Sequence, residues 1–383
     1  MHALPYWRLS GYYFFYFAFI GAFSPYFGLY LQSLSFSAWD IGLLMSQMQL
    51  MRMFGPNLWG WLADRFGYRL AIIRLAGAIS LAGFTAFFWL DRLPGMLLAM
   101  AVLAFFWSAA LPLVETLTFN HLRERPEQYS KVRLWGSVGF ILAVLLAGFV
   151  LNRVPIAYIV DICWVLLAGI LLLALLMPEA GEGRHAAAVQ PLRAILAQRH
   201  VQALLAACFA MSAAHGPLYA FYSIHLDGHG YSHAQVGLLW SLGVVAEIGV
   251  FLVMTRIARR HSLRNVLLAC HAAAALRFLL IGWCIDSALL ALLAQLMHGL
   301  TFGAFHAASI TAVNRWFPGR AQARGQALYS SLSFGAGGLL GTLLGGWMWE
   351  TLGAEWTYTG SAGFALLGYA LIARWVPVRD EGR

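Results

Sequence analysis

The amino-acid sequence predicts an all-α integral membrane protein with twelve transmembrane helices in two pseudo-symmetric six-helix bundles. The first observation is composition: of 383 residues, 61% are hydrophobic and 11% are charged, whereas a soluble domain carries roughly 25% charged residues. The second is an internal repeat with an offset of 195 residues, which relates segment 41–44 to 236–239 and Arg52 to Glu247. A duplicated membrane bundle is typical of secondary transporters that bind their substrate between the two halves.

The length of the chain sets the number of helices. At about 20 apolar residues per span plus short connections, it has room for twelve spans. They are predicted at 9–32, 39–62, 70–90, 95–120, 132–152, 155–177, 200–226, 234–257, 264–285, 287–313, 325–349 and 356–376. The longest polar stretch separates six spans from six. We therefore expect an N-terminal bundle over 1–177, a cytoplasmic inter-bundle linker over 178–199 and a C-terminal bundle over 200–383.

The distribution of positive charge predicts the topology. Of the 25 Lys and Arg residues, all but four fall on the side of the membrane that holds both termini; the exceptions are Arg92 and Arg153 on the opposite side and Arg52 and Arg277 within spans. By the positive-inside rule both termini are expected in the cytoplasm. The formal charge of +9 then reflects topology, not a nucleic-acid site. The run after Arg8 is too long and too aromatic for a secretory signal peptide and is expected to be the first span.

A loop signature follows the second span. Residues 60–69 read Gly-Trp-Leu-Ala-Asp-Arg-Phe-Gly-Tyr-Arg, which resembles the signature loop of the major facilitator superfamily, Gly-x-x-x-Asp-Arg-x-Gly-x-Arg, and implies that fold. The matching residues are expected to form a conformational latch: Gly60, Asp64, Arg65, Gly67 and Arg69. Gly60 would allow close helix approach, Asp64 would accept hydrogen bonds at a neighbouring helix N-terminus, and the two arginines would hold the cytoplasmic face. The second copy has Arg259 at the position of Asp64, so the latch is expected to be asymmetric.

Within that superfamily the chain resembles the phenylpropionate permeases over nearly its full length. This branch is related to the lactose and nucleoside proton symporters. The strings Tyr-Ser-Lys-Val-Arg-Leu-Trp-Gly-Ser at 129–137 and Leu-Trp-Ser-Leu-Gly-Val-Val-Ala-Glu at 239–247 carry the resemblance. Single positions add to it: Pro25, His215, Arg277, His298 and His306. The resemblance implies a proton-coupled carrier of 3-phenylpropionate or a related aryl acid.

Glu247 is the leading candidate for the proton carrier. A charge at the bilayer centre costs about 2.5–3.5 kcal/mol on insertion scales, so it is retained only where something offsets it. A carboxyl group in a low-dielectric site can exchange protons near neutral pH. Trp240 lies on the same helical face and is a candidate substrate contact. The alternative is a permanent ion pair with Arg52, Arg133 or Arg277, of which the superfamily's packing of spans five and eight favours Arg133.

Arg52 and Arg277 each lie in mid-span and remain charged, so each needs an anion. A carboxylate side chain or a substrate carboxylate held by a bidentate hydrogen-bond pair meets that need, and both alternatives stay open. Glu115 and Arg133 are eighteen residues apart on spans four and five. They resemble the Glu/Arg pair that binds sugar in the lactose branch. Both also lie near cytoplasmic span ends, where such side chains can simply snorkel to the surface.

Histidines and tyrosines complete the candidate site. His298 is the histidine expected to titrate, and His215 is a candidate substrate contact, although a lone histidine in a bundle is usually a hydrogen-bonded interior residue. His298 and His306 stand about 80° apart on an α-helix, poor geometry for one metal ion. The four cysteines all fall inside spans and indicate neither a disulfide framework nor a metal site. Tyr13 and Tyr16, in the aromatic run 12–17, offer rings on which an aryl group can stack.

The energy source is expected to be an ion gradient or the substrate's own gradient, with no cofactor, because the single lysine, Lys131, lies outside any nucleotide-binding loop. Moving an anion inward against an inside-negative potential costs about 2.3 kcal/mol per charge per 100 mV, which one accompanying proton cancels. With the resemblance, this predicts a monomeric transporter of the bacterial inner membrane, not an enzyme, whose partners are an aryl carboxylate, protons and lipid. Proton symport of a neutral nucleoside or sugar, proton-driven drug export and a transport-dead sensor are the alternatives.

Overall fold

The computed structural model describes residues 5–122, 128–179 and 192–378, and within them every predicted span is helical. Ten helical segments in this described part of the chain are long and apolar enough to cross a membrane. The predicted spans outside these ten are α2 (Ala38–Phe66), which carries Gln47, Gln49 and Arg52, and α16 (Ala354–Trp375). The all-α membrane fold predicted from composition is confirmed. The chain divides into two compact units, and the structure of each is described by itself.

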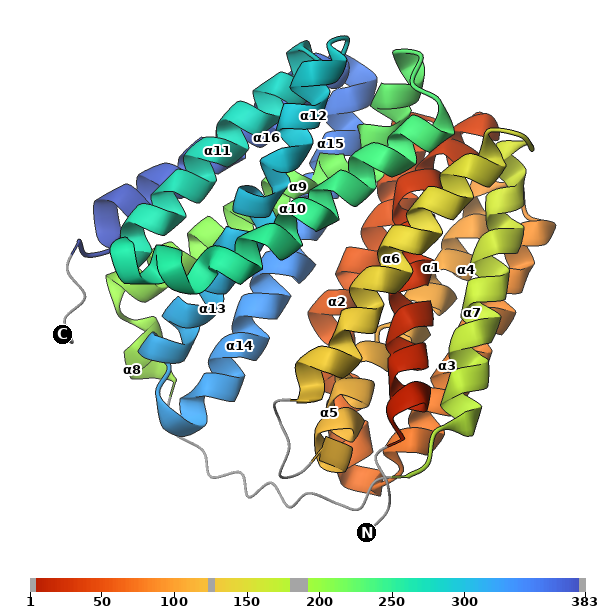
Figure 1. The fold of residues 1–383 in the computed structure, drawn as a ribbon, viewed down its shortest axis with the longest axis horizontal. Helices are drawn as coiled ribbons and strands as arrows, with labels where there is room; N and C mark the ends of the chain where they lie inside the picture. The colour runs from red at the N-terminus through yellow and green to blue at the C-terminus, as the bar shows by residue number, and fades with distance from the viewer. Residues whose placement is uncertain (1–4, 123–127, 180–191, 379–383) are drawn as a thin grey trace. The chain divides into compact units, whose positions relative to one another are not determined.

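The first unit comprises Met1–His185 and Tyr231–Leu238. Its helices are α1 (Tyr6–Ser33), α2, α3 (Arg69–Thr85), α4 (Leu93–Trp107), α5 (Ala110–Leu122), α6 (Tyr129–Leu151) and α7 (Ile159–Leu176), with 3-10 turns at Ala86–Phe88 and Ile156–Tyr158. Helices α4 and α5 together form one span. Helix α1 packs along α6 and α7 (Figure 1). The backbones of α1 and α6 touch at Gly139, where a Cβ would lie 2.2 Å from the Phe14 carbonyl oxygen.

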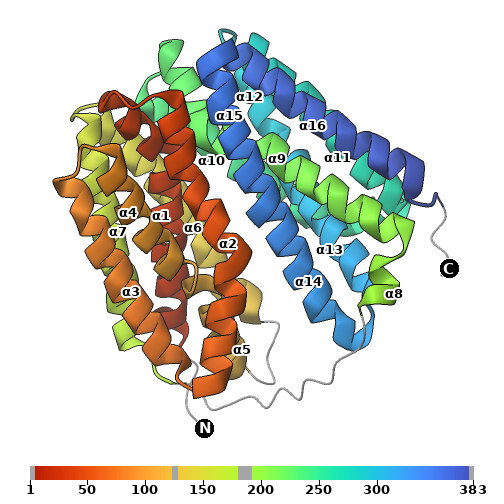
Figure 2. The ribbon, with the colours of Figure 1, turned by 180° about the vertical axis from the view of Figure 1, so that it is seen from behind.

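The second unit comprises Ala186–Gly230 and Leu239–Arg383. Its helices are α8 (Arg193–Leu196), α9 (Arg199–Gly228), α10 (His233–Arg260), α11 (Leu263–Trp283), α12 (Ala288–Leu296), α13 (Phe305–Trp316), α14 (Gln322–Ser330), α15 (Gly338–Leu352) and α16, with a 3-10 turn at Gly319–Ala321. Two predicted spans contain π-helical segments, η4 (Gly299–Ala304) and η6 (Ser331–Gly337). Helices α9 and α15 lie side by side (Figure 2). Most of the predicted linker, residues 180–191, lies outside the described residues, and α8 occupies its end.

Arginines from the third span of each unit cap the last helix of that unit. In the first unit Arg74 on α3 donates from Nε to the Ala174 carbonyl at 3.1 Å, and from Nη2 to Leu175 at 3.1 Å and Met177 at 3.0 Å. In the second unit Arg264 on α11 donates from Nη2 to the Ala373 carbonyl at 2.7 Å. The last carbonyls of a helix lack partners within it, and a cation there also meets the negative end of the helix dipole.

Replacing Arg74 with alanine is expected to destabilise the first unit by about 2 kcal/mol, because three charge-assisted hydrogen bonds to the end of α7 are lost together. The apparent melting temperature in detergent should fall by roughly 5 °C. Arg92→Ala, which removes an exposed arginine from the same unit, is the matched control. Equal melting temperatures for the two variants would show that the cap contributes nothing.

Candidate functional site

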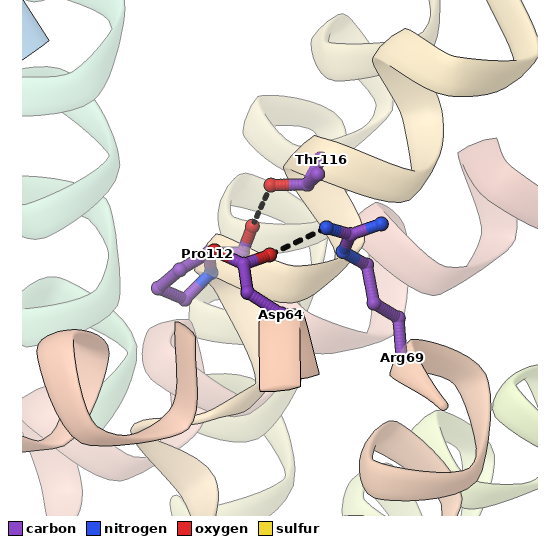
Figure 3. A network of polar contacts seen from close by, with 4 residues as sticks. All are labelled: Asp64, Arg69, Pro112 and Thr116. Atoms are coloured by element: carbon purple, nitrogen blue, oxygen red, sulfur yellow. Dashed lines mark hydrogen bonds and ion pairs between the residues drawn. The ribbon is translucent and has the colours of Figure 1, made fainter. Parts of the chain in front are cut away.

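The connection between α2 and α3 is a tight turn closed by an ion pair. Gly67 ends α2 in the left-handed conformation (φ 72°) that glycine adopts without strain. Arg69, the first residue of α3, donates from Nη2 to Asp64 Oδ1 at 2.5 Å (Figure 3). Asp64 thus accepts from a side chain at the neighbouring helix N-terminus and not from its backbone. The Arg65 guanidinium lies over the Trp61 ring at 5.8 Å.

The structure differs from the expectation for Gly60. A Cβ built on Gly60 meets no atom within 4 Å, so no described segment approaches it closely. Arg259, which replaces Asp64 in the second copy of the repeat, is exposed on the last turn of α10. The two loops therefore differ in local chemistry as expected, and their role as a latch stays a prediction. Figure 3 also shows α5, where the Thr116 hydroxyl donates to the Pro112 carbonyl at 3.0 Å.

Polar and aromatic side chains of α1, α5 and α6 meet inside the first unit. The Tyr129 hydroxyl donates to Glu115 Oε1 at 3.1 Å, and its ring meets the Tyr13 ring edge to face with centroids 6.5 Å apart. The Tyr13 hydroxyl lies 3.3 Å from Thr118 Oγ1. These contacts hold Glu115 and Tyr13 in one cluster. Tyr129 belongs to the 129–137 string, but nothing in that string indicates that its hydroxyl would bind Glu115.

The Arg133 guanidinium lies on aromatic faces, 3.9 Å from the Phe17 ring centroid and 5.9 Å from that of Tyr13. Within the described residues of the first unit it forms no ion pair or hydrogen bond. The two members of the candidate substrate-binding pair, Glu115 and Arg133, therefore form no ion pair with each other, although they lie near enough to interact electrostatically. Gly136 leaves room for this arrangement, because a Cβ there would lie 2.7 Å from Arg133 Nη1.

Tyr16 and Arg52 lie in the same unit. Tyr16 is buried and stacks on Trp107, with ring centroids 4.6 Å apart and planes 5° apart. One face of this predicted aryl contact is thus already covered by the protein. Arg52 is half-buried on α2 and forms no hydrogen bond or ion pair with the described residues of the first unit. It lies near enough to Tyr16 to act on its hydroxyl electrostatically.

Arg277 on α11 is 0% exposed and is surrounded by neutral acceptors. Its Nε donates to the Ala294 carbonyl at 2.8 Å, and its Nη1 donates to Thr301 Oγ1 at 3.0 Å and to His215 Nε2 at 3.4 Å. Its Nη2 donates to Gln295 Oε1 at 3.5 Å. No carboxylate among the described residues of this unit forms an ion pair with it.

This arrangement changes two expectations about Arg277. It is not the ion-pair partner of Glu247, and it does not offer a free edge for a bidentate substrate clamp in this conformation. His215 is equally occupied. Its Nδ1 lies 2.8 Å from the Met211 carbonyl, which only accepts, so Nδ1 carries the hydrogen and Nε2 accepts from Arg277. His215 therefore positions Arg277, and the structure does not support a direct substrate contact for it.

Trp240 and Glu247 lie on α10, and both contact their own unit. The Trp240 indole nitrogen donates to Ser223 Oγ at 3.0 Å, and its ring stacks near Tyr219 with centroids 6.1 Å apart. The Glu247 side chain lies against the π segment η4, where a Cβ on Gly303 would lie 3.2 Å from Glu247 Cγ. Gly303 therefore leaves the space that the Glu247 side chain occupies.

His298 and His306 do not keep the angular separation of an α-helix. His298 is stacked on Phe302 at 5.3 Å and 13°, and Phe302 on His306 at 6.1 Å and 12°. The π segment η4 separates them, and because a π turn takes more residues than an α turn, it rotates His306 back toward the face of His298. His298 Nδ1 is buried and has no hydrogen-bond partner among the described residues.

Known proteins share this architecture. The chain is 28% identical over 355 residues, covering 91% of this chain and 92% of its counterpart, to an Escherichia coli K12 protein named "Probable 3-phenylpropionic acid transporter". It is 28% identical over 346 residues, covering 88% and 86%, to the maltose permease of Geobacillus stearothermophilus. A crystal structure of a variant of the nucleoside transporter NupG matches with a TM-score of 0.87 at 19% identity, covering 96% of this chain and 99% of that one.

The comparisons agree with the resemblance found in the sequence. The structural match shows the same fold, and the two relatives span most of the chain. The MFS_1-like family matches residues 6–360. The chain therefore belongs to the MFS_1-like family and is a multi-pass membrane transporter of the major facilitator superfamily, not an enzyme.

Proposed function

We propose that this transporter takes up small aromatic carboxylates, such as 3-phenylpropionate, together with protons by alternating access. The observation that carries the proposal is Arg133. Its guanidinium is permanently charged, lies on the rings of Phe17 and Tyr13, and forms no ion pair with the described residues of the first unit, where Glu115 interacts with it only at longer range.

A cation kept within a membrane span needs an anion. A carboxylate fits the planar guanidinium fork through two parallel hydrogen bonds. Arg52, which also forms no ion pair with the described residues of its unit, is the second candidate clamp. Arg277 is a weaker candidate, because its donors are already engaged. The 28% identity to a protein named for 3-phenylpropionic acid transport supports this substrate class.

Glu247 is the proposed proton carrier. It is an acidic residue within a span and lies against the glycine of a π segment, a kind of irregularity that is frequent at functional sites. His298 is the second candidate because its Nδ1 lacks a partner in the described residues. It adjoins His215, which binds Arg277, and a second positive charge beside a buried cation is unfavourable. Glu247 is therefore ranked first.

The function is tested by uptake of labelled 3-phenylpropionate into vesicles that contain the purified protein. With the outside acidic, we expect accumulation above the external concentration, and an uncoupler should abolish it. Accumulation that survives the uncoupler would reject proton coupling. Absence of uptake for aryl carboxylates, with uptake of maltose or thymidine in the same vesicles, would reject the substrate class.

The proposed location is the bacterial cytoplasmic membrane with both termini in the cytoplasm. It rests on the excess of Lys and Arg in the connections on the side of the termini. A green fluorescent protein fused to the C-terminus should fluoresce, because that fluorophore matures in the cytoplasm, and an alkaline phosphatase fused there should be inactive. The reverse pattern would place the C-terminus outside.

A neutral sugar or nucleoside is the second candidate substrate. The hydrogen bond between Tyr129 and Glu115 places a carboxylate and a phenol together, and such groups bind hydroxyls well. The maltose permease is a relative of equal identity. Glu115→Gln should abolish uptake of a neutral substrate and leave aryl carboxylate uptake within about twofold, so this variant separates the two candidates.

A further inference from the structure

A column of nearly parallel rings runs along the tenth span. His298, Phe302 and His306 follow one another four residues apart, with interplanar angles of 13° and 12°. Phe334 from the second π segment closes one side, with its centroid 6.3 Å from that of Phe302 and 5.8 Å from that of His306. Both π segments of the described chain thus contribute to one aromatic cluster, here called the ring column.

The π geometry of η4 creates this column. In an uninterrupted α-helix the first and last of these residues would point about 80° apart. The same segment directs Thr301 to the Arg277 guanidinium and Gly303 to the Glu247 side chain. Phe302, the middle ring of the column, therefore lies between the residues that contact the buried arginine and the proposed proton carrier.

The exposure of the column favours a ligand surface over a closed core. Phe302, His306 and Phe334 each keep part of their surface uncovered. An imidazole facing lipid would be unfavourable, since polar side chains within spans normally face the bundle interior or a water-filled cavity. His298 is 9% exposed, and its unpartnered Nδ1 stands at the end of the column as a free hydrogen-bonding atom.

We propose that the ring column of His298, Phe302, His306 and Phe334 is the subsite that takes the planar aromatic part of the substrate. The inference rests on the proposed function and deepens it. The subsite would select substrates by a flat π surface and not only by a carboxylate. Stacking on such rings favours a planar aryl group over a puckered aliphatic ring of similar size. The His298 ring nitrogen is available to a polar group of the ligand.

The test measures binding of two probes, 3-phenylpropionate and 3-cyclohexylpropionate, to the purified full-length protein. Both probes carry the same carboxylate chain, and only one has a planar ring. We expect the wild-type protein to prefer the aryl probe roughly tenfold, because only a planar ring can stack on the rings of the column. Phe302→Leu and Phe334→Leu should each bring the two affinities to within about twofold of each other, and Phe302→Tyr should keep the preference.

Phe251→Leu is the matched control, because Phe251 is an exposed phenylalanine of α10 outside the column. The inference is supported if both column variants lose the preference for the aryl probe and the control keeps it. An unchanged preference in both column variants, with melting temperatures like that of the control, overturns it. If the wild-type protein binds neither acid but binds thymidine in a Phe302-dependent way, the subsite stands and the proposed substrate class falls. Binding of no aromatic probe overturns both.

Discussion

Replacing Arg133 with glutamine is expected to raise the KM for 3-phenylpropionate about 100-fold, with a smaller change in kcat. This corresponds to about 2.7 kcal/mol at 1.4 kcal/mol per factor of ten, within the loss expected when one partner of a buried charge pair is truncated. Arg133→Lys keeps the charge but not the two-pronged donor geometry, so an increase of about tenfold is expected. Initial rates of uptake over a range of substrate concentrations give both values.

Two further variants make this result specific. Lys131→Gln removes an exposed positive charge two residues away on α6 and should leave the KM unchanged. Gly136→Ala keeps every charge, but its Cβ would lie 2.7 Å from Arg133 Nη1 and 2.6 Å from Phe17 Cδ2. It should therefore displace the guanidinium and raise the KM. A normal KM in Arg133→Gln would reject this clamp and move the proposal to Arg52.

The helices were predictable because a bilayer imposes a strong and uniform constraint. Spanning segments must satisfy their backbone internally and be apolar for about 20 residues, so length and hydropathy locate ten of the twelve predicted spans among the described residues. The loop motif predicted a connection at Gly67 and Arg69, and the structure has a turn between α2 and α3 at these residues. Helix α2 is too polar to be identified as a span from hydropathy alone. The internal repeat therefore added information that hydropathy lacks.

The site was less predictable because it depends on contacts between distant residues. The sequence showed that Arg277 needs partners but not that carbonyl, hydroxyl, imidazole and amide acceptors would supply them. It showed Glu115 near Arg133 but not that Tyr129 would take the carboxylate. The π segments were also unforeseen, because glycine pairs such as Gly299 and Gly303 are equally compatible with close helix packing.

Replacing Glu247 with glutamine is expected to abolish uphill accumulation of 3-phenylpropionate while exchange of labelled for unlabelled substrate continues. Glutamine has nearly the shape of a protonated glutamate, so it fits the space beside Gly303, but it has no proton to release. The variant can then change between its two conformations with substrate bound, but it cannot do so without substrate. With the outside one pH unit more acidic, one proton per monocarboxylate sustains about tenfold accumulation in the wild-type protein, and the variant should show no net uptake into vesicles that contain no substrate.

The same vesicles supply both measurements: accumulation at steady state and exchange after preloading with unlabelled substrate. Glu350→Gln, which neutralises an exposed carboxylate of the same unit, should behave like the wild-type protein in both. Undiminished accumulation in Glu247→Gln would reject Glu247 as the proton carrier. Loss of accumulation and exchange together would instead favour the ion-pair alternative, because a carboxylate that only holds the bundle together is needed for every conformational step.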